Sequence, residues 1–203
     1  YEGALAVYGA DEMQRAYGTL LGVDAARVRA TSDGLMVGLA GRPLRFIDTP
    51  GHARHHHRIW DERTRGWFTG DTSGLSYDTA HGAWLLPTST PVQFDPPALR
   101  HSVQRLLQAE PQCMYLTHFG RVGDVQRLAG LLLEQLDEMV ALGLRLREAP
   151  DRHEALKAAM RELYACRLQQ HGVEDVTAGL ALLALDVELN AQGLAVWLDR
   201  PAR

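Results

Sequence analysis

Cysteine is scarce in this chain, and its two copies, Cys113 and Cys166, lie far apart in the sequence. Neither forms a C-x-x-C pair or stands beside another metal-binding residue at ligand spacing, which argues against a zinc-finger or dithiol redox motif. We expect both side chains to be buried, reduced thiols, which is consistent with a reducing cytoplasm.

The chain also lacks an excess of basic residues and a long apolar run. It has 21 Lys and Arg against 25 Asp and Glu, a formal net charge of -4, so we expect no nucleic-acid or membrane partner. No apolar stretch approaches the ~20 residues that a membrane span requires. The opening Tyr1-Glu2-Gly3 does not resemble a secretory signal, and we expect a cytoplasmic protein.

What the chain does contain is typical of a globular domain: 46% of its residues are hydrophobic and 23% are charged. Apolar periodicity predicts a strand-rich first part, with helices over 11–22 and 97–109, strands over 27–31, 35–40, 44–49 and 113–117, a hairpin from HRIWD and GWFTGD, and a loop over 78–95. After Arg121 only helical patterns follow, over 128–146, 153–170 and 178–198. Strands followed by helices favour an α+β or layered α/β fold.

Three apolar strands each end next to a residue that binds metal ions in proteins. His52 follows LRFIDT in the sequence TPGH, where Pro50 favours an extended residue before it and Gly51 permits a sharp turn. Asp71 follows WFTG, and His118 follows CMYLT. A single loop histidine is more often a surface residue, and a single aspartate more often caps a turn. Together, however, two imidazoles and a carboxylate favour a site for Zn²⁺, Fe²⁺ or Mn²⁺.

The neighbouring polar residues have two interpretations. His55, His56 and His57 either contact the substrate and support the ligands or form an exposed strand entrance, in which only His55 and His57 would share a face. Arg121 either holds an anionic substrate group with its planar guanidinium or is a solvated surface residue. We take His56 and Arg121 as candidate substrate-binding residues. The aromatic side chains nearby, Trp60, Trp67, Phe68 and Tyr115, are expected in the core.

These motifs, taken in series, resemble those of the metallo-β-lactamase fold superfamily, close to its glyoxalase II-like branch. FIDTPGHARHH resembles the TPGH motif, WFTGDT the GD motif, and YLTHFG the motif of the final histidine. The resemblance covers residues 1–121 and implies an α/β fold, the four-layer αββα sandwich with metal ions at one edge of its sheets. Residues 122–203 would be a helical extension that packs over the mouth of the site or forms a homodimer.

The resemblance also implies roles for the candidate ligands. His52 would bind the first metal ion, Asp71 would bridge both, and His118 would bind the second, with two Zn²⁺ expected and Fe or Mn as alternatives. Asp71 would thereby be the catalytic carboxylate. Such a site implies a hydrolase that uses a metal-bridging water on an ester, thioester, lactone or phosphodiester of a small molecule. The alternatives are a mononuclear iron oxygenase, similar to persulfide dioxygenases, and a non-catalytic scaffold of the same fold.

The sequence departs from the family pattern in one respect. The family's upstream H-x-H-x-D-H motif, which supplies the other ligands, has no counterpart here, and residues 1–47 contain no histidine. We therefore expect this chain to be the C-terminal part of a longer protein and to form a partial sandwich. With three ligands for two metal ions, the isolated 203-residue chain is expected to be inactive.

Overall fold

The computed structural model describes residues 2, 5, 9–89, 93–118 and 120–200, in two compact units, 1–31 and 32–203. The first unit contains helix α2 (Ala10–Tyr17) and a 3₁₀ turn (Ala25–Arg27). The predicted helix over 11–22 is confirmed in its first part but ends at Tyr17, directly before Gly18. The strand predicted over 27–31 is wrong, because the Asp24 side chain accepts a hydrogen bond from the Ala26 amide and starts a turn instead.

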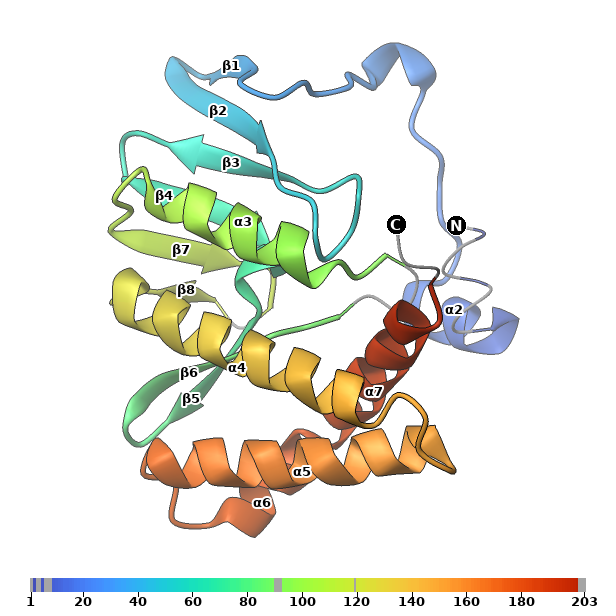
Figure 1. The fold of residues 1–203 in the computed structure, drawn as a ribbon. Coiled ribbons are helices and arrows are strands. Elements are labelled where there is room, and N and C mark those ends of the chain that lie inside the picture. The colour runs from blue at the N-terminus through green and yellow to red at the C-terminus, as the bar shows by residue number, and fades with distance from the viewer. Residues whose placement is uncertain (1, 3–4, 6–8, 90–92, 119, 201–203) are drawn as a thin grey trace. The chain divides into compact units, whose positions relative to one another are not determined.

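The second unit is built on a six-stranded mixed sheet in the order β1-β2-β3-β4-β7-β8 (Figure 1). Its strands are β1 (Met36–Leu39), β2 (Arg42–Asp48), β3 (His57–Asp61), β4 (Gly66–Gly70), β7 (Cys113–Leu116) and β8 (Arg121–Val122). Only the β4–β7 pair is parallel among these described strands, and the other neighbours are antiparallel. The strands predicted over 35–40, 44–49 and 113–117 and the HRIWD–GWFTGD hairpin are confirmed.

A second hairpin replaces the first part of the loop predicted over 78–95. Strands β5 (Leu75–Thr79) and β6 (Gly82–Leu86) pair antiparallel, with Tyr77 opposite Trp84. The Thr79 hydroxyl closes the turn, since it accepts from the His81 amide and donates to the Gly82 carbonyl. That prediction missed the alternation of LSYDT and GAWLL. Residues 90–92 of the predicted loop lie outside the described residues.

The helices of this unit are α3 (Pro96–Leu107), α4 (Val125–Arg145), α5 (Arg152–Gln170), α6 (Val176–Leu182) and α7 (Ala184–Leu198). The single helix predicted over 178–198 is two helices, because the chain bends by 60° at a buried Leu183. No single described helix is long and apolar enough to cross a membrane. The bent α6–α7 pair, taken together, has the length and the apolar composition of a membrane span.

Two apolar cores hold the second unit together. One lies between the sheet and helices α3 and α4, and it contains Ile47, Trp60, Trp67, Met114, Val103, Leu106, Leu128 and Leu132. The other joins the β5–β6 hairpin to α4, α5 and α7, and it contains Trp84, Leu86, Leu136, Met139, Met160, Tyr164, Val187 and Leu194. Residues on both sides of residue 121 contribute to these cores. The division into a domain over 1–121 and a helical extension over 122–203 stays a prediction.

The opposite face of the sheet carries an apolar row. The strand register places Phe46, Ile59, Phe68 and Tyr115 side by side across four strands. Phe68 is 43% exposed, so its predicted place in the core is wrong, whereas Trp60 and Trp67 are buried as predicted. One further correction concerns the thiols, since Cys113 is buried but Cys166, on α5, is exposed. The fold is thus mixed α/β, with a six-stranded mixed sheet and C-terminal helices.

Candidate metal centre

The three predicted ligands follow three strands that run in the same direction. Strand β2 is antiparallel to β3, which is antiparallel to β4, so β2 and β4 point the same way. Strand β7 is parallel to β4. The carboxyl ends of β2, β4 and β7 therefore meet at one edge of the sheet (Figure 1). His52, Asp71 and His118 follow those ends in the sequence.

The TPGH turn is held against the start of helix α3. Gly51 has φ = +130°, and a β-carbon there would lie 2.2 Å from the backbone nitrogen of Leu99. Its carbonyl accepts a hydrogen bond from the Asp95 amide at 2.7 Å, while the Ser102 hydroxyl donates to the Pro50 carbonyl at 2.6 Å. Only glycine fits this close approach, and the turn fixes the histidine that follows it.

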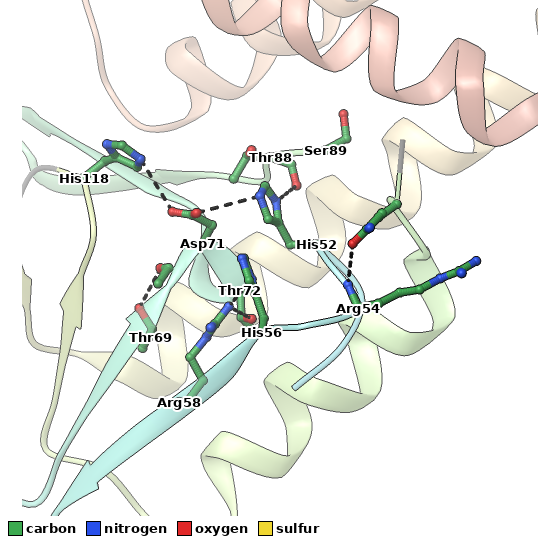
Figure 2. Close-up of polar contacts among 12 residues, drawn as sticks. His52, Arg54, His56, Arg58, Thr69, Asp71, Thr72, Thr88, Ser89 and His118 are labelled. Carbon is green, nitrogen blue, oxygen red and sulfur yellow. Dashed lines mark hydrogen bonds and ion pairs between the residues drawn. The ribbon is translucent and has the colours of Figure 1, made fainter. Parts of the chain in front are cut away.

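Asp71 lies between two imidazoles and presents a different oxygen to each (Figure 2). Its Oδ2 is 3.7 Å from Nε2 of His52, and its Oδ1 is 3.6 Å from Nε2 of His118. These distances exceed those of hydrogen bonds. They are close to ~3.4 Å, the edge of a tetrahedron whose centre is ~2.1 Å from each ligand atom. The Oδ1 atom is buried and accepts no hydrogen bond from the described residues.

His52 has its tautomer set by the backbone. Its Nδ1 lies 3.2 Å from the carbonyl oxygen of Thr88, and since a carbonyl only accepts, Nδ1 carries the proton. The bare Nε2 of the neutral ring then faces Asp71, as a metal ligand requires. Burial lowers the pKa of His52, against the opposing effects of Thr88 and the Asp71 carboxylate, and this favours the neutral form.

His56 joins this group, although it was predicted only as a substrate contact. Its ring stacks on that of His52 at 5.0 Å, and ligand atoms of His52, His56 and Asp71 all lie within 4.8 Å of one another. However, the guanidinium of Arg58 donates to its Nδ1 at 2.7 Å, which leaves the proton on Nε2. As arranged here, Nε2 of His56 is a hydrogen-bond donor, and the neutral ring must lose its bond from Arg58 to bind a metal ion through either nitrogen. The other two histidines of the run, at positions 55 and 57, are exposed.

Arg58 is a buried residue of the site that the sequence did not reveal. It is 3% exposed, donates to the His57 carbonyl at 2.6 Å and to the hydroxyl of Thr72, and reaches His56. Burial lowers its pKa to about 10, opposed by the Asp71 carboxylate. Burial first, and then the charge of Arg58, lowers the pKa of His56 to about 3. The signal available in the sequence was one arginine directly before the apolar pair Ile59 and Trp60 of strand β3.

Arg121 lies in β8 opposite Tyr115. Its pKa is raised by hydrogen bonding to Cys113 first and to Tyr115 to a lesser degree. Because Cys113 begins strand β7 and His118 follows its end, the Arg121 side chain extends toward the far end of that strand. Its role as a substrate contact stays a prediction.

A cavity of about 470 Å³ lies away from these ligands, between the β5–β6 hairpin and helices α5 and α6. Trp84, Leu168, Val173, Leu182 and Leu183 form much of its apolar lining. None of the three predicted ligands lines it, so the candidate metal centre is identified by its donor atoms rather than by a deep pocket.

Comparison with known proteins finds no matching family model. The metallo-β-lactamase fold-containing protein ST1585 of Sulfurisphaera tokodaii is 33% identical over 84 residues, which is 41% of this chain and 30% of that protein. The crystal structure of ST1585 from Sulfolobus tokodaii, an archaeal metallo-β-lactamase superfamily protein, matches with a TM-score of 0.53 and 28% identity, over 68% of this chain and 49% of that one.

A second solved structure shares the fold. The metallo-β-lactamase family protein TTHA1429 from Thermus thermophilus matches with a TM-score of 0.51 and 22% identity, over 76% of this chain and 48% of that one. The chain thus spans about half the length of these two solved structures. Together with the converging strands and the His52, His56 and Asp71 group, these matches show that the chain is similar to metallo-β-lactamase superfamily proteins over part of their fold.

Proposed function

We propose that this chain supplies metal ligands to a hydrolase that cleaves an ester, thioester, lactone or phosphodiester bond of a small molecule. One observation carries the proposal: the two oxygens of Asp71 face the Nε2 atoms of His52 and His118 separately. A carboxylate placed in this way is suited to bridge two cations, with one histidine on each.

The residues fit divalent cations in three respects. The nitrogen–oxygen distances match the edges of a coordination sphere better than hydrogen bonds, and the buried Oδ1 of Asp71 needs a positive partner. His52 carries its proton on the nitrogen that faces away from Asp71. Zn²⁺ is our first choice, and Fe or Mn would suit the same donor set.

Each residue then has a role at this site. Bound cations would supply a water nucleophile at neutral pH by lowering the pKa of that water. Asp71 would hold the two cation positions together, while His52 and His118 would complete one side of each. His56, with its proton on Nε2, would donate a hydrogen bond to a substrate oxygen beside His52. Arg58 would keep His56 neutral and in that tautomer.

The position of His118 favours this proposal over a one-iron oxygenase. A single cation held by His52 and the Oδ2 atom of Asp71 would not require a second imidazole, that of His118, at the Oδ1 atom. Metal content of the active form, with its full ligand set, separates the two, since about two zinc ions per chain support the hydrolase and one iron supports the oxygenase.

We further propose that the active form uses ligands beyond these residues, from a second β-sheet. Catalytic zinc ions have about three protein ligands each, and the three residues around Asp71 are too few for two such ions. The apolar row that contains Phe68 supports this proposal, since a second sheet packed on it would bury that row. The 203-residue chain alone is therefore expected to hydrolyse neither thioesters nor phosphodiesters.

The test is Co²⁺ binding, followed by absorption spectroscopy and calorimetry, in the wild-type chain and in Asp71→Asn and His118→Ala. Each substitution removes one metal ligand and should reduce affinity by more than the ~10–100-fold that is typical of outer partners. His101→Ala is the matched control, because it removes an exposed imidazole from α3. Equal affinity in Asp71→Asn and wild type would refute the proposed site.

A further inference from the structure

A single side chain of helix α7 holds the segment Pro87–Ser89. Asn190 is 2% exposed, and its Oδ1 accepts from the Ser89 amide at 2.8 Å and from the Ser89 hydroxyl at 3.0 Å. Its Nδ2 donates to the Pro87 carbonyl at 3.0 Å and to the Tyr164 hydroxyl at 3.0 Å. Every hydrogen-bonding atom of this amide is thus used, in a buried place where unpaired groups are costly.

The segment also touches α7 at a second point. A β-carbon at Gly193 would lie 2.0 Å from the Oγ atom and 2.6 Å from the Cβ atom of Ser89. Gly193 is close to Asn190 along the same helix, and its missing side chain lets Ser89 lie directly against the helix. Two independent contacts therefore hold this extended stretch on α7.

Between the two residues that Asn190 binds lies Thr88, whose carbonyl is the partner of His52. The Nδ1 of His52 donates to that oxygen at 3.2 Å, and the opposite nitrogen of the ring faces Asp71 (Figure 2). The bonds on both sides of Thr88 fix the two flanking peptide groups. The direction of the Thr88 carbonyl, and with it the proton position on His52, follows from those bonds.

We propose that Asn190 is a positioning residue for His52, which acts through the backbone of Pro87–Ser89. It keeps the Thr88 carbonyl pointed at Nδ1, so that Nε2 of His52 stays unprotonated and directed at Asp71. The C-terminal helices, in this view, set the ligand geometry from behind the site. The consequence for metal binding rests on the proposed function, whereas the effect on the His52 tautomer does not.

Asparagine suits this role because it combines a donor and an acceptor on one short side chain. Aspartate would keep the acceptor for the Ser89 amide but would lose the donor to Pro87 and place a charge in a buried site. Alanine would lose both. The expected loss of Co²⁺ affinity for Asn190→Ala is ~10–100-fold, as for other outer partners of metal-binding histidines.

The test uses the metal-free 203-residue chain labelled with ¹⁵N. Two-bond ¹H–¹⁵N correlation spectra report which nitrogen of His52 is protonated, and comparison with His52→Asn assigns its signals. Wild type should show a protonated Nδ1 and a bare Nε2, while Asn190→Ala should show a mixture of both tautomers. Gln192→Ala is the matched control, because it removes an amide from the same helix that bonds Glu188 instead. Co²⁺ titration of the same samples gives the affinity.

Gly193→Ala provides a second variant in case Asn190→Ala does not fold. It removes no hydrogen-bonding group and displaces Ser89 by contact, so it should shift the same His52 signals. A folded Asn190→Ala or Gly193→Ala protein with unchanged His52 nitrogen shifts would overturn the proposal. A changed tautomer in a chain that binds no Co²⁺ even as wild type would support the coupling and count against the proposed function.

Discussion

The glycine of the TPGH turn offers the sharpest test of how this fold places His52, the first of the proposed ligands. Replacing Gly51 by alanine adds one β-carbon where the backbone has φ = +130° and where that atom would lie 2.2 Å from the nitrogen and 2.3 Å from the α-carbon of Leu99. Both contacts are with helix backbone, which a rotamer change cannot relieve. The turn or the start of α3 must move.

The cost has two parts. The backbone conformation costs an alanine ~1–3 kcal/mol. Displacing the α3 backbone costs about 1–3 kcal/mol more, as in other overpacked sites. The sum, ~2–6 kcal/mol, is a large fraction of the roughly 5–15 kcal/mol that typically stabilises a domain. Because His52 follows directly, its separation from Asp71 should also increase.

Gly82→Ala separates the two parts. Gly82 has φ = +94°, but a β-carbon there meets no atom within 4 Å. That variant should lose only the backbone contribution, ~1–3 kcal/mol. Urea unfolding followed by circular dichroism gives both free energies of unfolding, and Co²⁺ titration gives the affinity. Only Gly51→Ala should lose affinity.

Equal destabilisation by the two substitutions would refute the reasoning. It would mean that the turn relaxes away from α3 without cost, so that the close approach to Leu99 does not hold the turn. Unchanged Co²⁺ affinity in a folded Gly51→Ala protein would show that His52 does not depend on that turn for its position.

Two further predictions concern protonation. In wild type, His56 should titrate near pH 3 by NMR. Arg58→Met should raise the pKa of His56 only part of the way to its usual value, because the lowering by burial remains. A wild-type pKa near 6.5 would contradict this prediction. The Arg42 guanidinium holds the pKa of Asp61 below its usual value, so that ion pair stabilises the fold above pH ~4 and the contribution is lost on acidification. In urea unfolding, the stability difference between wild type and Asp61→Asn should therefore shrink from pH ~6 to pH ~2, and a constant difference would argue against it.

The local chemistry of this protein could be read from its sequence. Apolar alternation around Ile47 and Trp67 marked the strands, and Pro50-Gly51 marked the turn that presents His52. Three candidate ligands at three strand ends, two histidines and one aspartate, indicated a metal site. These features depend on neighbours in the chain, through strand alternation and the conformations that proline and glycine allow.

Local patterns also produced the errors. The sequence predicts a loop where the β5–β6 hairpin forms, because the two strands are short and partly polar. It predicts one continuous helix over 178–198, because the apolar pattern continues through the bend at Leu183. Phe68 was placed in the core because its apolarity says nothing about which face of the sheet is covered.

By itself, the sequence determined which residues stand at the strand ends and what they can bind. Only the tertiary structure decided that those ends meet at one edge, because strand order and the parallel β4–β7 pair follow from contacts between distant segments. It also assigned His56 its tautomer through Arg58, and it brought Asn190 to the segment that orients His52. Such roles depend on burial and on hydrogen bonds between residues up to about a hundred positions apart, and these are formed when the cores pack.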